Sequence, residues 1–122
     1  MKHSEAFLKL VNEAKSKIKE TNAATTGRRK ACGEKFYLVD VREDDEWRQG
    51  RAAGSIHIGK GVIERDIETL IPNKEAEIIL YCGGGFRSAL AAESLQKMGY
   101  SQVSSMDGGI RAWREAGLPE EK

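Results

Sequence analysis

The fold of this chain is decided by residues 77–88, which read EIILYCGGGFRS. Residues 77–81 are rich in branched and aromatic side chains, and such a short apolar run predicts a buried strand. Cys82 follows this strand, three glycines follow the cysteine, and a helical pattern covers residues 88–98. In sheets of parallel strands, ligands bind at the carboxyl ends of the strands. We therefore expect the functional site at Cys82.

Strand and helix patterns alternate on both sides of this stretch. Short apolar runs predict further strands, and helical spacing predicts further helices; the strands are expected at 36–39, 55–58 and 102–106, and the helices at 43–49, 62–71 and 110–116. Alternation of this kind requires crossover connections and favours a mainly parallel sheet. The predicted fold class is α/β, with helices on both faces of a central sheet.

The N-terminal third of the chain has a different character. Residues 1–20 predict an amphipathic helix with Ser4 as its N-cap, on a stripe of Phe7, Val11, Ala14 and Ile18. The stripe is too short for a sustained coiled coil, so the helix is expected to pack on the domain, with a dimer contact as the alternative. Residues 21–35 lack apolar periodicity and predict a loop or a poorly formed helix. The main domain is then 36–119, and 122 residues suit a single domain overall.

The composition excludes several classes of function. Lysine and arginine number 20 and aspartate and glutamate 19, and a net charge of +1 argues against binding to nucleic acid or to a membrane surface. No apolar run approaches the roughly 20 residues that span a bilayer. Charged residues interrupt the N-terminus where a signal peptide would be apolar, so we expect a cytoplasmic protein. Two cysteines in such a compartment are expected to be separate thiols.

The residues around Cys82 favour a reactive thiolate. Three glycines let the backbone turn its N–H groups inward, and the helix that follows adds its unpaired N–H groups and the positive end of its dipole. This cradle suits an anion, namely the Cys82 sulfur or an oxyanion beside it. The anion-binding set is predicted to be Gly83, Gly84, Gly85, Phe86, Arg87 and Ser88. The alternative is a tight glycine-rich turn with an inert buried cysteine.

Four sequence blocks, in order, make the chain resemble the rhodanese family. They are LVDVR at 38–42, EW at 46–47 with GRAAGSIHI at 50–58, the Cys82 loop, and GGIRAW at 108–113 with GLP at 117–119. The resemblance implies a rhodanese-like three-layer fold, with the N-terminal helix as an addition. It implies that Cys82 takes a sulfur atom from a donor such as thiosulfate, becomes a persulfide, and passes the sulfur to cyanide, a small thiol or a protein thiol. It also implies supporting roles for Asp40 and Arg42, either in the chemistry or as an ion pair at a strand end, and no cofactor.

Other functions remain as alternatives. A persulfide carrier without turnover, or a binding module, would keep the same loop. The chain also resembles a group of phosphatases that share this fold and have five residues between the catalytic cysteine and an arginine. Here only four residues lie between Cys82 and Arg87. The shorter loop should be too tight for a phosphate group. Cys32 is interpreted as an incidental thiol, with a resolving role for the Cys82 persulfide as the alternative. The cysteines and histidines show no zinc-ligand spacing, so no metal site is expected.

Overall fold

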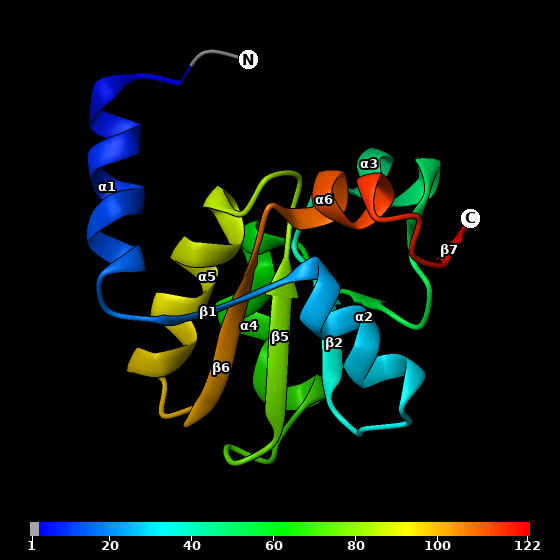
Figure 1. The fold of residues 1–122 in the computed structure, drawn as a ribbon. Coiled ribbons are helices and arrows are strands. Elements are labelled where there is room, and N and C mark those ends of the chain that lie inside the picture. The colour runs from blue at the N-terminus through cyan, green and yellow to red at the C-terminus, as the bar shows by residue number, and fades with distance from the viewer. Residues whose placement is uncertain (1–2) are drawn as a thin grey trace.

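The central sheet of the computed structural model, which describes residues 3–122, consists of five parallel strands (Figure 1). Their spatial order is β1 (Lys19–Asn22), β6 (Gln102–Asp107), β5 (Glu77–Tyr81), β2 (Tyr37–Asp40) and β4 (Ile56–His57). The strand that carries Cys82 is therefore the middle one. The α/β fold with a mainly parallel sheet is confirmed.

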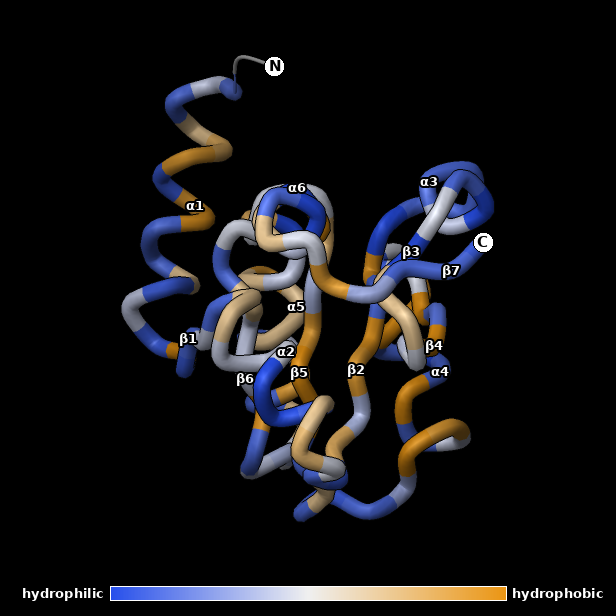
Figure 2. The backbone as a smooth tube through the Cα atoms, turned by 45° about the vertical axis from the view of Figure 1, so that its right-hand side comes forward, coloured by the Kyte–Doolittle hydropathy of each residue, from blue (hydrophilic) through white to orange (hydrophobic). Residues whose placement is uncertain are grey.

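Helices cover both faces of this sheet, as the sequence predicts. One face packs against α4 (Ile63–Leu70) and α5 (Phe86–Lys97), and the short 3₁₀ helix η1 (Lys60–Val62) directly precedes α4. The other face packs against α2 (Ala23–Ala31) and α6 (Gly109–Glu115), while α3 (Asp44–Gln49) lies beyond the end of β2. Figure 2 shows hydrophobic residues concentrated along β5 and β2 and in α4.

Strand β5 supplies both halves of the core. Successive side chains of a strand point to opposite faces, so Ile78 and Leu80 enter one apolar cluster and Ile79 and Tyr81 enter the other. All four side chains are at most 1% exposed. Burying such a side chain contributes about 1.5–3 kcal/mol, which fixes β5 and the cysteine at its end.

The N-terminal helix α1 (Glu5–Lys15) packs on the domain, as predicted, against α5. It is shorter than the predicted 1–20: residues 1–2 lie outside the described part of the chain, and at the other end the helix stops before Ile18, because β1 pairs with β6 from Lys19 onward. The hydroxyl of Ser4 accepts a hydrogen bond from the Phe7 N–H at 3.1 Å, which confirms Ser4 as the N-cap. Val11 and Ala14 of the predicted stripe are fully buried. In Figure 1, α1 and α6 lie on either side of the beginning of α5.

Residues 21–35 differ from the predicted loop or poorly formed helix. They contain the end of β1 and all of α2, whose N-cap Asn22 accepts a hydrogen bond from the Thr25 N–H at 2.8 Å. The buried face of α2 is made of Ala23, Thr26 and Gly27. Leu118 packs so closely over Gly27 that a Cβ there would lie 2.8 Å from it. The buried face of α2 is therefore made of small residues, and the sequence has no apolar stripe that would predict this helix.

A second, two-stranded sheet connects the C-terminus to the domain. Strand β3 (Arg51–Ala52) pairs antiparallel with β7 (Glu120–Glu121), and neither strand is predicted by the sequence. The Trp113 indole N–H donates to the carbonyl of Pro119 at 2.7 Å, and Arg114 pairs with Glu120 at 2.9 Å. Across residues 3–122, none of the helices has the length and hydrophobicity needed to cross a bilayer.

Candidate functional site

Cys82 lies directly after β5, and its sulfur is held by the loop that follows. The Gly85 N–H donates to Sγ at 3.1 Å, and the thiol lies 3.6 Å from the hydroxyl of Ser88. That hydroxyl is hydrogen bonded to Ser105 of β6 at 2.8 Å. Gly85 has a φ of +103°, a backbone conformation that residues with a side chain rarely adopt. Helix α5 begins at the next residue. The predicted order of strand, cysteine, glycine loop and helix is therefore present.

The beginning of α6 fixes the orientation of the loop peptides. The N–H groups of Ile110 and Arg111 donate to the carbonyls of Cys82 and Gly83, at 2.9 and 3.2 Å. In a trans peptide the C=O and the next N–H point in opposite directions. The N–H groups of Gly83 and Gly84 therefore point away from α6, and both glycines line an open cleft. This orientation is compatible with the anion cradle that the glycine triplet predicts.

The close approach of α6 to the loop requires a glycine at position 109. Gly109 has a φ of +55°. A Cβ at this position would overlap the carbonyl oxygen of Cys82 and lie 2.6 Å from that of Gly83. In the sequence, Gly109 is recognisable only as part of the GGIRAW block. The contact between Gly109 and the cysteine loop is seen only in the folded structure.

The cleft above Cys82 has a volume of about 980 Å³. Its lining comes from the loop and the first turn of α5, from α3 and α6, and from the N-terminal segment; the residues are Cys82, Gly83, Gly84, Phe86, Arg87, Glu46, Arg111, His3, Ser4 and Phe7. Of the predicted set, Gly85 and Ser88 contact the sulfur but do not line the cleft. Five lining residues are not among the predicted site residues, namely Glu46, Arg111 and the three N-terminal residues His3, Ser4 and Phe7.

Arg87, one of the predicted anion-binding residues, forms an ion pair with Glu46. Its two terminal nitrogens donate to the two carboxylate oxygens of Glu46 at 2.7 and 3.1 Å. The hydrogen bond to Glu46 raises the pKa of Arg87, and the same bond lowers the pKa of Glu46. Glu46 also accepts the Glu43 N–H at 3.0 Å in the capping box of α3. The capping box is the one local sequence feature that gives Glu46 a role, and it does not predict the contact between Glu46 and Arg87.

Arg111 is the cation of the cleft whose charge is not neutralised. Its side chain has no hydrogen bond or ion pair with any of residues 3–122, and it is exposed. Glu46 and Arg87 cancel each other, so the charged groups that line the cleft leave one net positive charge on Arg111. The cleft is therefore suited to a ligand that carries an anionic group.

Asp40 and Arg42 form a buried ion pair beside the site. Arg42 donates to Asp40 through Nε at 3.0 and 3.1 Å and through Nη2 at 2.8 Å, and Nη2 also donates to the Gly50 carbonyl at 2.7 Å. Although burial opposes the charge, the hydrogen bond to Asp40 raises the pKa of Arg42. Neither residue lines the cleft. This geometry matches the alternative that the sequence left open, an ion pair at a strand end.

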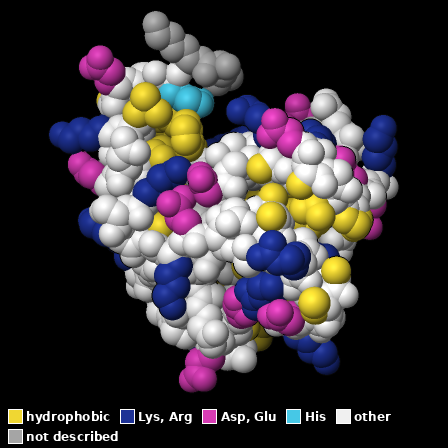
Figure 3. All heavy atoms as spheres, in the orientation of Figure 1, with side chains coloured by type: hydrophobic (Ala, Val, Ile, Leu, Met, Phe, Trp, Pro, Cys, Tyr) yellow, Lys and Arg dark blue, Asp and Glu magenta, His cyan; other side chains and the backbone are white. Residues whose placement is uncertain are grey.

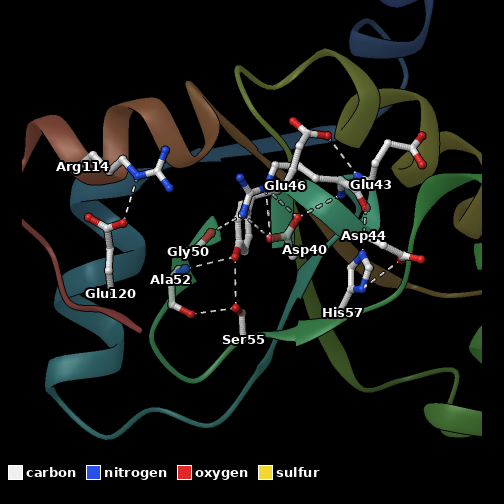
Figure 4. A network of polar contacts seen from close by, with 12 residues as sticks. Asp40, Glu43, Asp44, Glu46, Gly50, Ala52, Ser55, His57, Arg114 and Glu120 are labelled. Carbon is white, nitrogen blue, oxygen red and sulfur yellow. Dashed lines mark hydrogen bonds and ion pairs between the residues drawn. The ribbon is translucent and has the colours of Figure 1, made fainter. Parts of the chain in front are cut away.

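The ion pair belongs to a larger polar network around the end of β2. Figure 4 shows Asp40 close to Gly50, Ala52 and Ser55. The hydroxyl of Tyr81, the residue before the cysteine, accepts the Ala52 N–H at 3.1 Å and lies 3.0 Å from the hydroxyl of Ser55. Burial raises the pKa of Tyr81, so this phenol stays neutral. The network positions the end of β5 rather than contacting the sulfur.

Cys32 is exposed and is far from this site. It follows the last residue of α2, a helix that begins at the carboxyl edge of the sheet, after β1. A helix of 9 residues is about 13 Å long, so Cys32 lies toward the opposite edge from Cys82. This placement disfavours the resolving role. Among residues 3–122, no group of three or more histidine, cysteine, aspartate or glutamate side chains is arranged to hold a metal.

Known proteins resemble this chain over nearly its whole length. A family model described as the Rhodanese-like domain matches residues 11–116. YtwF of Bacillus subtilis is 34% identical over 84% of this chain and 97% of its own length. A protein named sulfurtransferase from Allochromatium vinosum is 32% identical over 84% of this chain and 94% of its own. The structure of RPA3614 from Rhodopseudomonas palustris, a protein of unknown function described as a possible tyrosine phosphatase, superposes with a TM-score of 0.87 at 31% identity, covering 99% and 98% of the two chains.

Proposed function

The chain belongs to the rhodanese-like domain family, and from that membership we propose that it transfers sulfane sulfur through a persulfide on Cys82. One observation carries the proposal. The Cys82 sulfur is held by the Gly85 N–H at the base of a loop whose residues Gly83 and Gly84 line an open cleft and turn their N–H groups away from α6. Such an array stabilises negative charge on sulfur, which is the charge that a persulfide carries.

The first step is a displacement at sulfur, with thiosulfate as the proposed donor. The Cys82 thiolate attacks the outer sulfur of thiosulfate, an S–S bond forms to Cys82, and the S–S bond of the donor breaks. Sulfite leaves with the electron pair, and Cys82 becomes a persulfide. The reaction needs a nucleophilic thiolate and an anion cradle but no cofactor. Cyanide or a thiol then takes the outer sulfur and regenerates the Cys82 thiolate.

The contacts of the other predicted residues support a role for each of them in this proposal. Gly83 to Ser88 supply the cradle, and Ser88 fixes the sulfur from the side of β6. Arg87 holds Glu46, and this pair forms one wall of the cleft. Asp40 and Arg42 are positioning residues, because they hold the strand end and touch neither the cleft nor the sulfur. Both cysteines are free thiols, a state that the reducing cytoplasm maintains, and we place the protein there.

A phosphatase is the weaker candidate, even though RPA3614 is described as a possible one. Only four residues separate Cys82 from Arg87, one fewer than in the phosphatases that share this fold, and the shorter loop leaves less room for a phosphate group. A persulfide carrier that does not turn over keeps the same chemistry at Cys82. Turnover with a small acceptor separates the carrier from the enzyme.

Thiosulfate:cyanide sulfur transfer by the wild-type protein and two cysteine variants tests the proposal. Cys82→Ser should abolish the transfer, and Cys32→Ser, the matched control at the exposed thiol, should leave it unchanged. An aryl-phosphate assay on the same proteins should show negligible hydrolysis. Sulfur transfer that survives in Cys82→Ser would overturn the proposal, and hydrolysis that depends on Cys82 and exceeds sulfur transfer would favour the phosphatase.

A further inference from the structure

An aromatic wall closes one side of the cleft, and part of it comes from outside the family-matched residues 11–116. The His3 ring lies 5.1 Å from the Phe7 ring and 5.0 Å from the Phe86 ring, and the two phenylalanine rings are 6.2 Å apart. All three side chains line the cleft above Cys82. Figure 3 shows hydrophobic side chains gathered beside a histidine on the upper part of α1, where the surface is hollowed.

The wall is held against the cleft by the docking of α1. Val11 and Ala14 of α1 are buried against α5, and Lys15 extends over the Phe86 ring, with 5.3 Å from Nζ to the ring centre. Lys15 also pairs with Asp107 at 3.2 Å. Aromatic pairs at these centroid distances attract one another, and a further ring can join the cluster at the same spacing. The wall therefore offers a ready surface for an aromatic group of a ligand.

The charge and the size of the cleft add two constraints. Arg111 is its unneutralised cation, so a bound molecule should carry an anionic group. The volume of about 980 Å³ falls within the roughly 300–1,000 Å³ typical of sites for organic ligands. Thiosulfate or cyanide alone would leave most of that space and the aromatic wall unused.

We propose that the sulfur acceptor of this protein is an organic thiol that carries both an aromatic group and a carboxylate. This inference rests on the proposed persulfide chemistry. The ring packs on Phe7, Phe86 and His3, and the carboxylate pairs with Arg111. The acceptor thiolate attacks the outer sulfur of the Cys82 persulfide. A new S–S bond forms to the acceptor, the bond to Cys82 breaks, and Cys82 leaves as the thiolate, so that the acceptor becomes the persulfide.

The first experiment measures binding without any chemistry. Amide NMR shifts of Gly83 and Gly84 are followed during titration with 3-phenylpropanoate or with propanoate, two ligands that differ only in the ring. Burial of the ring predicts at least about tenfold tighter binding of 3-phenylpropanoate. Phe7→Leu should weaken that ligand about fivefold by removing the aromatic contact. Arg111→Gln should weaken both ligands by about fivefold through loss of the ion pair.

The control variant is Leu10→Ala, on the exposed side of the same helix. It should bind both ligands as the wild-type protein does, which separates loss of the wall from loosening of α1. Equal affinities for the two ligands in the wild-type protein would overturn the inference. So would an unchanged preference for the ring in Phe7→Leu together with unchanged binding in Arg111→Gln.

The second experiment tests the acceptor itself. Persulfidated protein is mixed with 2-mercapto-3-phenylpropanoate or with 2-mercaptopropanoate, and the loss of the outer sulfur is timed by mass spectrometry. The phenyl compound should discharge the persulfide about tenfold faster at low concentration. Equal rates would overturn the acceptor assignment. A protein that binds 3-phenylpropanoate selectively but never forms a persulfide would contradict the proposed function and leave the ligand class of the cleft standing.

Discussion

Replacement of Asp40 by asparagine tests whether its pair with Arg42 maintains the fold or takes part in the chemistry. The carboxylate accepts the Arg42 backbone N–H at 2.9 Å and three contacts from its guanidinium, and the two side chains are 0% and 4% exposed. Removing one partner of a buried ion pair costs about 3–5 kcal/mol. Asparagine keeps an oxygen for the backbone N–H, and Arg42 keeps the Gly50 carbonyl. We therefore expect a loss near the lower limit, about 3 kcal/mol.

Urea denaturation followed by the fluorescence of the buried Trp113 measures this loss. The matched control is Asp66→Asn, which removes one partner of an exposed ion pair with Arg65 and should leave the urea midpoint nearly unchanged. Without urea, the folded Asp40→Asn protein should keep kcat for sulfur transfer within roughly twofold of wild type. A change in unfolding free energy below about 1 kcal/mol would refute the structural reasoning. A large loss of kcat at unchanged stability would assign Asp40 to the chemistry.

Three further predictions concern the loop and the cleft. Gly109→Ala should lower the unfolding free energy by about 2 kcal/mol in thermal denaturation, because its Cβ would overlap the Cys82 carbonyl. Gly84→Ala, with open space at that Cβ, is the control, and equal stability of the two variants would contradict the packing argument. Glu46→Gln should cost about 1 kcal/mol at neutral pH. Because folding lowers the pKa of Glu46, its contribution is complete above the pKa of an unfolded glutamate and is lost as the pH falls through the folded value. The difference from wild type should therefore vanish in acid, and a constant difference would contradict the ion pair. Arg87→Ala should raise the thiosulfate KM, because it leaves the Glu46 carboxylate unpaired in the cleft. Adding Glu46→Ala to this variant should reverse much of that rise. Additive effects of the two substitutions on KM would argue against the pairing.

The sequence predicts those parts of the fold that depend on local patterns. Strand β5 and the cysteine loop follow from an apolar run, three glycines and a helical stripe, and the structure has β5 at the predicted residues 77–81. Local patterns do not predict helix α2, because its buried face is formed by Ala23, Thr26 and Gly27. Close packing against Leu118 selects small residues there, and small residues carry no hydrophobic period.

The sequence predicts the site residues that belong to the cysteine loop, but it does not predict those that other elements contribute. Cys82 and the residues after it are adjacent in the chain, so their chemistry can be derived from their order. The partner of Arg87 is Glu46, 41 positions away, and the side chain of Phe7 reaches the same cleft from α1. Such neighbours are set by the packing of whole elements. For this reason the pairing of Arg87 with Glu46 and the unpaired charge of Arg111 become visible only once the fold is known.

The central claim is that Cys82 accepts one sulfur atom. Intact-protein mass spectrometry after incubation with thiosulfate, followed by peptide mapping, tests it directly. The wild-type protein and Cys32→Ser should each gain the mass of one sulfur atom, located on Cys82 and removed by cyanide. Cys82→Ser should gain none. A wild-type protein that takes up no sulfur, or takes it up on Cys32 instead, would contradict the account.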